Sequence, residues 1–162
     1  MHKEELIQQA LWLTKQSEKI VVKLPMSIEG IQAVMCLKKE KPKMKIAVTT
    51  VVSVAQAILV GKAGADIVAL FNGAFDTESD TPVDIVAPIR EIYAHYGYKT
   101  KILSCCRFPR GVGEYAAAGT DMITLGKDFI TMLYEHPYTD KRMLGFIKDW
   151  TGSFGSRTWP KE

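Results

Sequence analysis

The sequence predicts an α/β protein built on a sheet of parallel strands. Five short runs rich in β-branched residues alternate with stretches whose apolar residues recur at helical spacing. Regular strand–helix alternation is typical of parallel strands joined by right-handed crossovers. The composition, 47% hydrophobic and 24% charged over 162 residues, is that of an ordinary globular chain. We therefore expect a single domain over residues 1–162.

The five expected strands are runs of four to six residues, which are too short to be helices. Their β-branched residues suit a pleated, buried surface. The first run, Ile20-Val21-Val22-Lys23-Leu24-Pro25, is apolar on both faces apart from its lysine, and a proline ends it. The expected strands comprise residues 20–25, 45–50, 66–71, 100–104 and 122–125.

The expected helices carry recognisable start and stop signals. Ser27 and Ser53 are suitable N-caps for the two helices that follow the first and second strands. Gly64 suits the left-handed position that ends the second of these helices. Thr81-Pro82 places a cap before a proline in the first helical turn. The expected helices comprise residues 4–16, 28–39, 54–63, 82–96, 109–118, 127–135 and 139–150.

Two architectures share this alternation, an open doubly wound sheet and part of a (βα)8 barrel. Five strands suit the open sheet, and 162 residues are fewer than the roughly 200 that a full barrel requires. However, no Gly-x-Gly-x-x-Gly or Walker-type loop follows a strand, so the nucleotide site typical of an open sheet lacks support. The residue pattern alone leaves both architectures open.

Composition and spacing argue against several classes of function. The net charge of +3 is small and the basic residues are scattered, which disfavours a nucleic-acid partner. No apolar run approaches the roughly 18 residues of a membrane span, and the acidic start does not suit a signal peptide. The three cysteines and three histidines lack the spacing of a disulfide framework or a metal site. We therefore expect a cytoplasmic protein without a metal or other cofactor and without a membrane partner.

Lys23 is an unusual residue for a buried strand, because removing an ammonium group from water is costly. At the downstream end of a parallel strand it would point toward the edge of the sheet where α/β folds place their chemistry. A desolvated lysine has a larger uncharged fraction, which a Schiff-base enzyme needs. The alternative is a structural lysine that extends from the strand end to solvent.

Five segments, in order, resemble the small-subunit transaldolase and fructose-6-phosphate aldolase family. They are residues 21–25 (Val-Val-Lys-Leu-Pro), 29–30 (Glu-Gly), 55–57 (Ala-Gln-Ala), 62–65 (Lys-Ala-Gly-Ala) and 149–155 (Asp-Trp-Thr-Gly-Ser-Phe-Gly). The resemblance runs from about Glu4 to Gly155 with only small gaps. It implies a (βα)8 barrel, so the fold we expect is an incomplete barrel of about five strand–helix units plus a C-terminal helix.

The resemblance implies class I aldol chemistry, in which a lysine at the end of the fourth barrel strand forms a Schiff base. Lys23 matches that lysine. The substrate implied is a ketose phosphate, from which a dihydroxyacetone unit is cleaved or transferred without a cofactor. Thr49 matches a threonine of the next strand that helps to hold a catalytic water. As an alternative, Thr49 is a β-branched strand residue without a function.

The resemblance also implies that part of the barrel has no counterpart in this sequence. Counting back from Lys23, residue 1 falls in the helix before the fourth strand of the family, so three strands and their carboxylate and amide groups are absent. An arc of five strands leaves two edges unpaired and its inner face uncovered. Two alternatives follow: a catalytically incomplete member with an assembly or sugar-binding role, and an independent binding domain in which Lys23 is structural.

The segments expected to bind substrate depart from the family pattern. Phe71 stands where the aldolase branch has a tyrosine and transaldolases have phenylalanine, although it is equally suited to a core aromatic. Ala74 replaces an expected arginine, and Cys105 (or Cys106) replaces an expected serine. Arg107 matches a basic position that can bind phosphate, for which guanidinium is far better suited than a thiol.

The last helix suits a contact between subunits. The family forms rings in which the closing helix packs on a neighbouring subunit, so the resemblance implies a homo-oligomer. Leu144, Phe146 and Trp150 are the apolar residues expected to make this contact, although packing within the subunit would also explain them.

Overall fold

A computed structural model describes residues 2–71 and 85–155, and it divides the chain into two compact units. The first unit, residues 1–125, contains one sheet of five parallel strands in the order β1-β2-β3-β4-β5. The strands are β1 (Val22–Pro25), β2 (Ile46–Val51), β3 (Ile67–Leu70), β4 (Lys101–Cys105) and β5 (Met122–Thr124). All five expected strands are therefore confirmed, although most are shorter than the apolar runs that predicted them.

Helices connect the strands of the first unit. They are α1 (Lys3–Thr14), α2 (Ile28–Glu40), α3 (Val54–Ala63), α5 (Val86–Tyr96) and α6 (Pro109–Ala117). The expected caps are present: the Oγ of Ser27 accepts a hydrogen bond from the Gly30 N–H at 3.0 Å, and the Oγ of Ser53 accepts one from the Gln56 N–H at 3.2 Å. Gly64 ends α3 with a φ of 80°. The helix start expected at Thr81-Pro82 lies outside the described residues.

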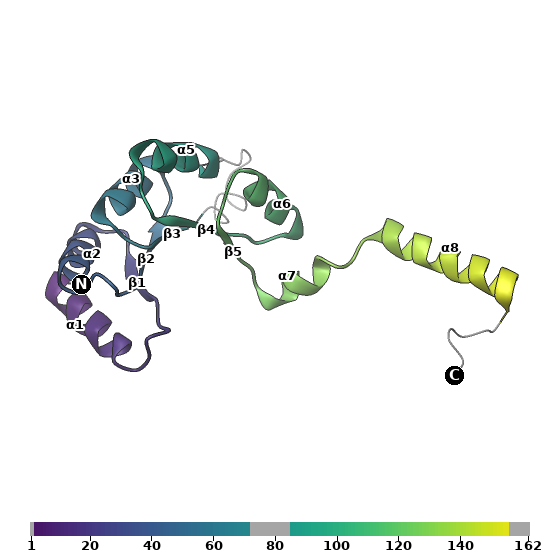
Figure 1. Ribbon diagram of the computed structural model, residues 1–162, viewed down its shortest axis with the longest axis horizontal. Helices are drawn as coiled ribbons and strands as arrows, with labels where there is room; N and C mark the ends of the chain where they lie inside the picture. Colours follow the sequence, from purple (N-terminus) through teal and green to yellow (C-terminus); the bar gives the residue numbers. More distant parts are fainter. Residues whose placement is uncertain (1, 72–84, 156–162) are drawn as a thin grey trace. The chain divides into compact units, whose positions relative to one another are not determined.

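The helices cover one face of the sheet, which identifies the sheet as an arc of a barrel. In Figure 1 the helices lie along the outer side of the curved row of strands, and no described helix of this unit lies on the inner side. The side chains that face the helices, such as Val48, Val68 and Ile102, are fully buried. A doubly wound sheet would carry helices on both faces and reverse its strand order. The prediction of an incomplete (βα)n barrel is confirmed.

The helix layer is held to the sheet by apolar packing with a few buried hydrogen bonds. Tyr93 of α5 is buried, and its hydroxyl donates a hydrogen bond to the Ala57 carbonyl of α3 at 2.6 Å. Burial raises the pKa of Tyr93, which keeps the phenol protonated as a donor. Gly61 leaves room for this contact, since a Cβ there would lie 2.6 Å from the ring of Tyr98.

Two aspartates hold the amino ends of the strands together. Asp66 follows an Ala-Gly-Ala sequence and Asp121 follows Ala-Gly-Thr, so the same local pattern starts β3 and β5. The carboxylate of Asp66 accepts hydrogen bonds from the Ile46 N–H at 2.9 Å and from the ammonium groups of Lys38 and Lys45 at 3.0 and 3.1 Å. These two ammonium groups come from α2 and from the residue before β2.

Asp121 repeats this arrangement one strand pair further along the sheet. Its carboxylate accepts hydrogen bonds from the Ile102 N–H at 2.7 Å and from the guanidinium of Arg90 in α5. Partial burial opposes ionisation of Asp66 and Asp121. The backbone and cationic donors outweigh it, so the pKa of each carboxyl lies below its ordinary value. The amino-end face of the sheet is thus a set of satisfied ion pairs.

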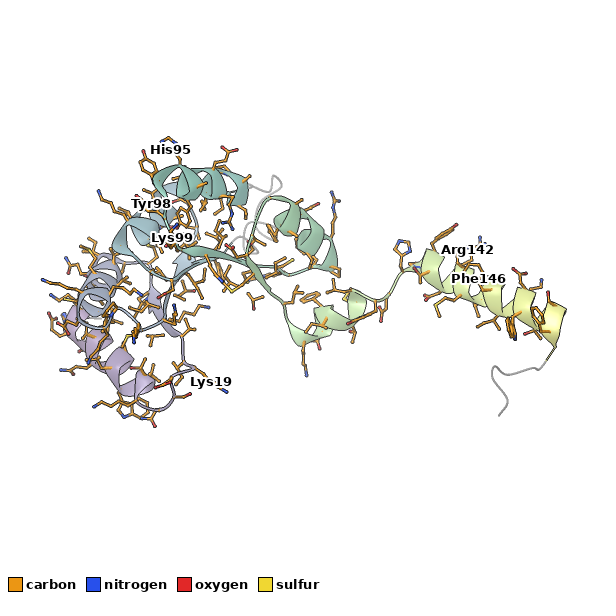
Figure 2. All side chains as sticks on the ribbon, in the orientation of Figure 1. Lys19, His95, Tyr98, Lys99, Arg142 and Phe146 are labelled. Atoms are coloured by element: carbon orange, nitrogen blue, oxygen red, sulfur yellow. The ribbon has the colours of Figure 1, made fainter. Side chains whose placement is uncertain are left out.

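The second unit, residues 126–162, contains α7 (Lys127–Met132) and α8 (Pro137–Phe154). Five apolar residues of α8 recur at spacings of three and four, which places them on one stripe: Met143, Phe146, Ile147, Trp150 and Phe154. Figure 2 labels Arg142 and Phe146, whose guanidinium carbon and ring centre lie 4.7 Å apart. Leu144, also named from the sequence, lies about 100° around the helix from Met143, at the edge of the stripe.

Candidate active site on the inner face of the sheet

The candidate site lies on the inner face of the arc. Lys23, Ala47, Ile67 and Lys101 are register partners across four strands, so their side chains point to the same face of the sheet. The residues on either side of Lys23, Val22 and Leu24, are buried at 3% exposure under the helices, whereas Lys23 is exposed. The lysine therefore projects from the inner face, away from the helix layer.

Lys23 and Thr49 are brought together at the edge of the sheet. Both line a cavity of about 270 Å³ that also borders Pro25 and α1. Pro25 is the register partner of Thr49, and this pair lies two residues further along the strands than the pair of Lys23 and Ala47. The Met26 N–H donates to the Thr49 carbonyl at 3.0 Å, which extends the β1–β2 pairing past the proline. Two residues named separately from the sequence thus share one concave surface.

The turn after β1 packs closely against the end of the strand. A Cβ on Gly30 would lie 2.0 Å from the Pro25 carbonyl oxygen, so the first turn of α2 approaches the strand end more closely than any side chain permits. The same carbonyl oxygen accepts a hydrogen bond from the Ser27 N–H at 3.0 Å. This close approach gives a physical reason for the Glu-Gly pair after the lysine strand.

The backbone beside Thr49 is in an uncommon conformation. Thr50 has a φ of 62°, in the left-handed region that a β-branched residue rarely adopts. The register between β2 and β3 shifts between Val48 and Val51, which is where this residue sits. The side-chain oxygen of Gln56 accepts the Val52 N–H at 2.8 Å and ties the following loop to α3. The carboxyl end of β2 is therefore strained and supported, as is frequent at functional sites.

Phe71 and Arg107 meet at the ends of the next two strands. The guanidinium carbon of Arg107 lies 5.6 Å from the ring centre of Phe71, within range of a cation–π contact. Phe71 is half-buried and Arg107 is exposed. Their strands are paired: Leu70, the residue before Phe71, is the register partner of Ser104, which lies three residues before Arg107. Ala74, where the family pattern predicts an arginine, lies outside the described residues.

The structure distinguishes the two cysteines. Cys105 alternates with the buried residues of β4 and is half-buried on the inner face, where Thr124 of β5 is its register partner. Cys106 is buried on the helix side, and its thiol donates to the Phe108 carbonyl at 3.0 Å. Only Cys105 is therefore positioned toward the candidate site.

The inner face carries cationic groups. Among the described residues of the strands and the two positions after each strand, its charged side chains are Lys23, Lys101 and Arg107. No carboxylate lies on this face within the described part of the strands. Such a surface favours an anionic ligand through Coulombic attraction.

Sequence reasoning missed Thr50 and Thr124. Thr124 is a polar residue near the downstream end of a strand, the same signal that singled out Lys23, and it lies beside Cys105. No local signal marks Thr50, because its positive φ follows from the register shift between β2 and β3. That shift depends on a pairing between strands that the sequence does not specify.

A search for related proteins identifies the chain's relatives. A family model described as transaldolase/fructose-6-phosphate aldolase matches residues 2–155. A protein named "Probable transaldolase" from Dictyoglomus turgidum is 40% identical over 148 residues, which are 91% of this chain and 68% of that protein.

Proteins with the same name from Lactiplantibacillus plantarum and Methanococcus maripaludis are 39% and 35% identical. Each match extends over 148 residues, which are 91% of this chain and 67% and 68% of the respective relative. The chain therefore spans about two thirds of the length of these relatives.

Proposed function

The chain belongs to the transaldolase/fructose-6-phosphate aldolase family, and on that premise we propose that Lys23 forms a Schiff base with a ketose phosphate. The reaction is the cleavage or transfer of a dihydroxyacetone unit. The observation that carries the proposal is the position of Lys23, exposed on the inner face of the arc and lining one cavity with Thr49.

The proposed chemistry begins with the uncharged amine of Lys23. Its nitrogen attacks the ketone carbon, and loss of water leaves an iminium cation joined to the enzyme. The bond between substrate carbons 3 and 4 then breaks. Its electron pair moves toward the iminium to form an enamine, and the other fragment leaves as an aldehyde after its hydroxyl loses a proton. The enamine is either protonated, which releases a ketone after hydrolysis, or it attacks an acceptor aldehyde. Thr49 holds the water through which these protons move.

Arg107 and Phe71 are proposed to bind the phosphorylated end of the substrate. The guanidinium is exposed at the end of β4, and its contact with the Phe71 ring holds it over the inner face. A guanidinium pairs with phosphate through two parallel hydrogen bonds, which makes it the strongest phosphate ligand available on this surface. Cys105 lies on the same face and contributes at most a weak donor.

Phe71 favours transfer over simple cleavage. A phenyl ring has no proton to give, so acid–base assistance must come from another group. No carboxylate lies on the inner face of the described strands. This observation also favours the second candidate function, a catalytically incomplete family member whose role is assembly or sugar binding.

We also propose that α8 joins copies of the chain into an oligomer. The apolar stripe that includes Phe146 and Trp150 has the spacing of a helix face that packs on another helix.

Of the residues that the structure describes, no helix is both long and apolar enough to traverse a lipid bilayer. A role in cytoplasmic carbohydrate metabolism, within the pentose phosphate pathway, completes the proposal.

Borohydride trapping tests the function directly. The full chain is incubated with dihydroxyacetone or with fructose 6-phosphate and reduced, and the product is analysed by intact mass and peptide mapping. A reduced adduct on Lys23 supports the proposed Schiff base, and turnover assays then distinguish aldolase from transaldolase activity. A folded chain without an adduct on Lys23 contradicts it and leaves the incomplete-member function.

A further inference from the structure

The carboxyl end of β2 departs from regular strand alternation. Val48 and Val51 are both fully buried in the apolar core, although they lie three residues apart. A regular strand would direct two such residues to opposite faces of the sheet. The left-handed Thr50 breaks the alternation, so that Thr49 and Thr50, half-buried and exposed, both lie between the two buried valines. The backbone directly after Thr49 therefore has a conformation that a regular strand would not impose.

Backbone hydrogen bonds attach this segment to the strands on both sides. The Thr49 carbonyl accepts the Met26 N–H, which follows β1, at 3.0 Å. The Val51 carbonyl accepts the Phe71 N–H, which follows β3, at 2.9 Å. Thr50 lies between these two attachments. A β-branched residue persists in the left-handed region only where the surrounding structure determines its conformation, so these bonds and any others nearby must hold it.

Gln56 supplies a third attachment, and it does so with its side chain. Its Oε1 accepts the Val52 N–H at 2.8 Å, two residues after Thr50. Its backbone N–H donates to the Oγ of Ser53, the N-cap of α3, at 3.2 Å. Gln56 is half-buried and does not line the cavity beside Lys23. It would therefore act on the site only through the backbone that it holds.

We propose that Gln56 is a positioning residue for the reaction at Lys23. By holding Val52 it keeps Thr50 in the left-handed conformation, and this fixes the orientation of Thr49 in the cavity. The inference rests on the proposed function, in which Thr49 holds the water that moves protons at the Schiff base. Proton transfer through a held water requires hydrogen-bond distances, so a small rotation of the Thr49 peptide slows it.

A positioning role predicts a change in rate without a change in equilibrium. A held water speeds both the formation and the breakdown of the Schiff base, so its displacement slows the two equally. The adduct on Lys23 should then accumulate more slowly and still reach the same final amount. A residue needed only for folding would instead lower the final amount together with the folded fraction.

Time-resolved borohydride trapping tests the inference on the full chain. The substrate is dihydroxyacetone, which forms the Schiff base without a carbon–carbon bond to break, and peptide mapping measures the adduct on Lys23. Gln56→Met keeps the length of the side chain and loses the oxygen. Its rate of adduct accumulation should fall at least about tenfold, and its final amount should stay within about twofold of the wild type.

Two further variants separate positioning from helix capping. Gln56→Glu retains an acceptor oxygen for the Val52 N–H, so its rate should stay within about threefold of the wild type. Ser53→Ala removes the other hydrogen bond at the start of α3, which affects the stability of the helix, and its rate should stay within about twofold. Slowing in Q56E or in S53A equal to that in Q56M overturns the positioning role.

The wild-type chain distinguishes failure of this inference from failure of the proposed function. A folded wild type that forms no adduct on Lys23 overturns both. A wild type that forms the adduct, with an unchanged rate in Q56M, overturns the positioning role alone. Hydrogen exchange at the wild-type Val52 amide tests the contact even if Q56M does not fold. Protection of at least about tenfold is expected, and exchange at the rate of an unstructured chain overturns the inference.

Discussion

The amino end of the sheet and its inner face use polar side chains in opposite ways. At the amino end, Asp66 and Asp121 each accept a backbone N–H and at least one cationic donor from a neighbouring helix. On the inner face, Lys23, the second residue of β1, and Arg107, which follows the carboxyl end of β4, are both exposed, and the Arg107 guanidinium lies over the ring of Phe71. Polar groups that are satisfied stabilise a fold, and polar groups left accessible can bind a ligand.

In this barrel arc, the residues that stabilise the fold are therefore different from those proposed to carry out chemistry. Backbone strain follows the same division, since the one non-glycine residue with positive φ in the described chain, Thr50, is at the carboxyl end. At the amino end, each aspartate instead joins the starts of two neighbouring strands through a hydrogen bond from a backbone N–H. Substitutions at the two ends should therefore change different measurements.

Replacing Lys23 should produce the largest effect. In Lys23→Met the trapped adduct should fall at least about a hundredfold, because the proposed Schiff base forms on the Lys23 nitrogen. The free energy of unfolding should change by less than about 1 kcal/mol, because the side chain is exposed. Lys101→Met is the matched control, since Lys101 is exposed in the same register row. An adduct that survives in K23M, or disappears in K101M, refutes the assignment.

Replacing Asp66 should have the opposite result: lower stability with the Lys23 adduct retained. Asp66→Ala leaves the Ile46 N–H and two ammonium groups without their acceptor, which should lower the free energy of unfolding by about 2 kcal/mol in urea titrations. Asp121→Ala should lower the free energy of unfolding by less, because Asp121 accepts hydrogen bonds from two donors and lies beside an edge strand. Both variants should still form the Lys23 adduct under conditions where they are folded. An Asp66 variant with unchanged stability would show that these hydrogen bonds and ion pairs do not stabilise the fold.

Arg107 should affect substrate preference more than overall reactivity. Arg107→Gln should reduce the preference for fructose 6-phosphate over dihydroxyacetone in trapping about tenfold, through loss of the charged phosphate contact. Arg110→Gln serves as the control, since Arg110 pairs with Glu114 on α6 and is exposed. A preference that changes equally in both variants would indicate a general effect of charge.

The smallest expected effect is on the pH dependence of stability. The folded-state pKa of Asp66 lies below its ordinary value, so its ionised form contributes stability above the unfolded-state pKa, near 4. That contribution is lost as the pH falls through the lowered folded-state pKa. Urea midpoints should therefore differ most between the wild type and Asp66→Asn above about pH 5, and converge below about pH 4. A difference in urea midpoints that grows as the pH falls would show that another titratable group controls the pH dependence of stability.

Local patterns in the sequence predicted much of this protein. The β-branched runs, the serine caps before α2 and α3, and the glycine that ends α3 are each recognised within a few residues, because they depend on local backbone preferences. The sequence placed Lys23 at the downstream end of its strand, whereas the structure places it second in β1, exposed between the buried Val22 and Leu24. Membership of the family followed from short motifs in the right order, which the match over residues 2–155 confirms.

Pairings between distant segments decided the rest. One-sided helix packing, not strand count, separated a barrel arc from an open sheet. The register of neighbouring strands determines which cysteine faces inward. It also determines that Arg107 contacts Phe71 and which donors surround Asp66. A shift of one residue in a strand moves every side chain to the other face, so only the assembled sheet determines which groups meet.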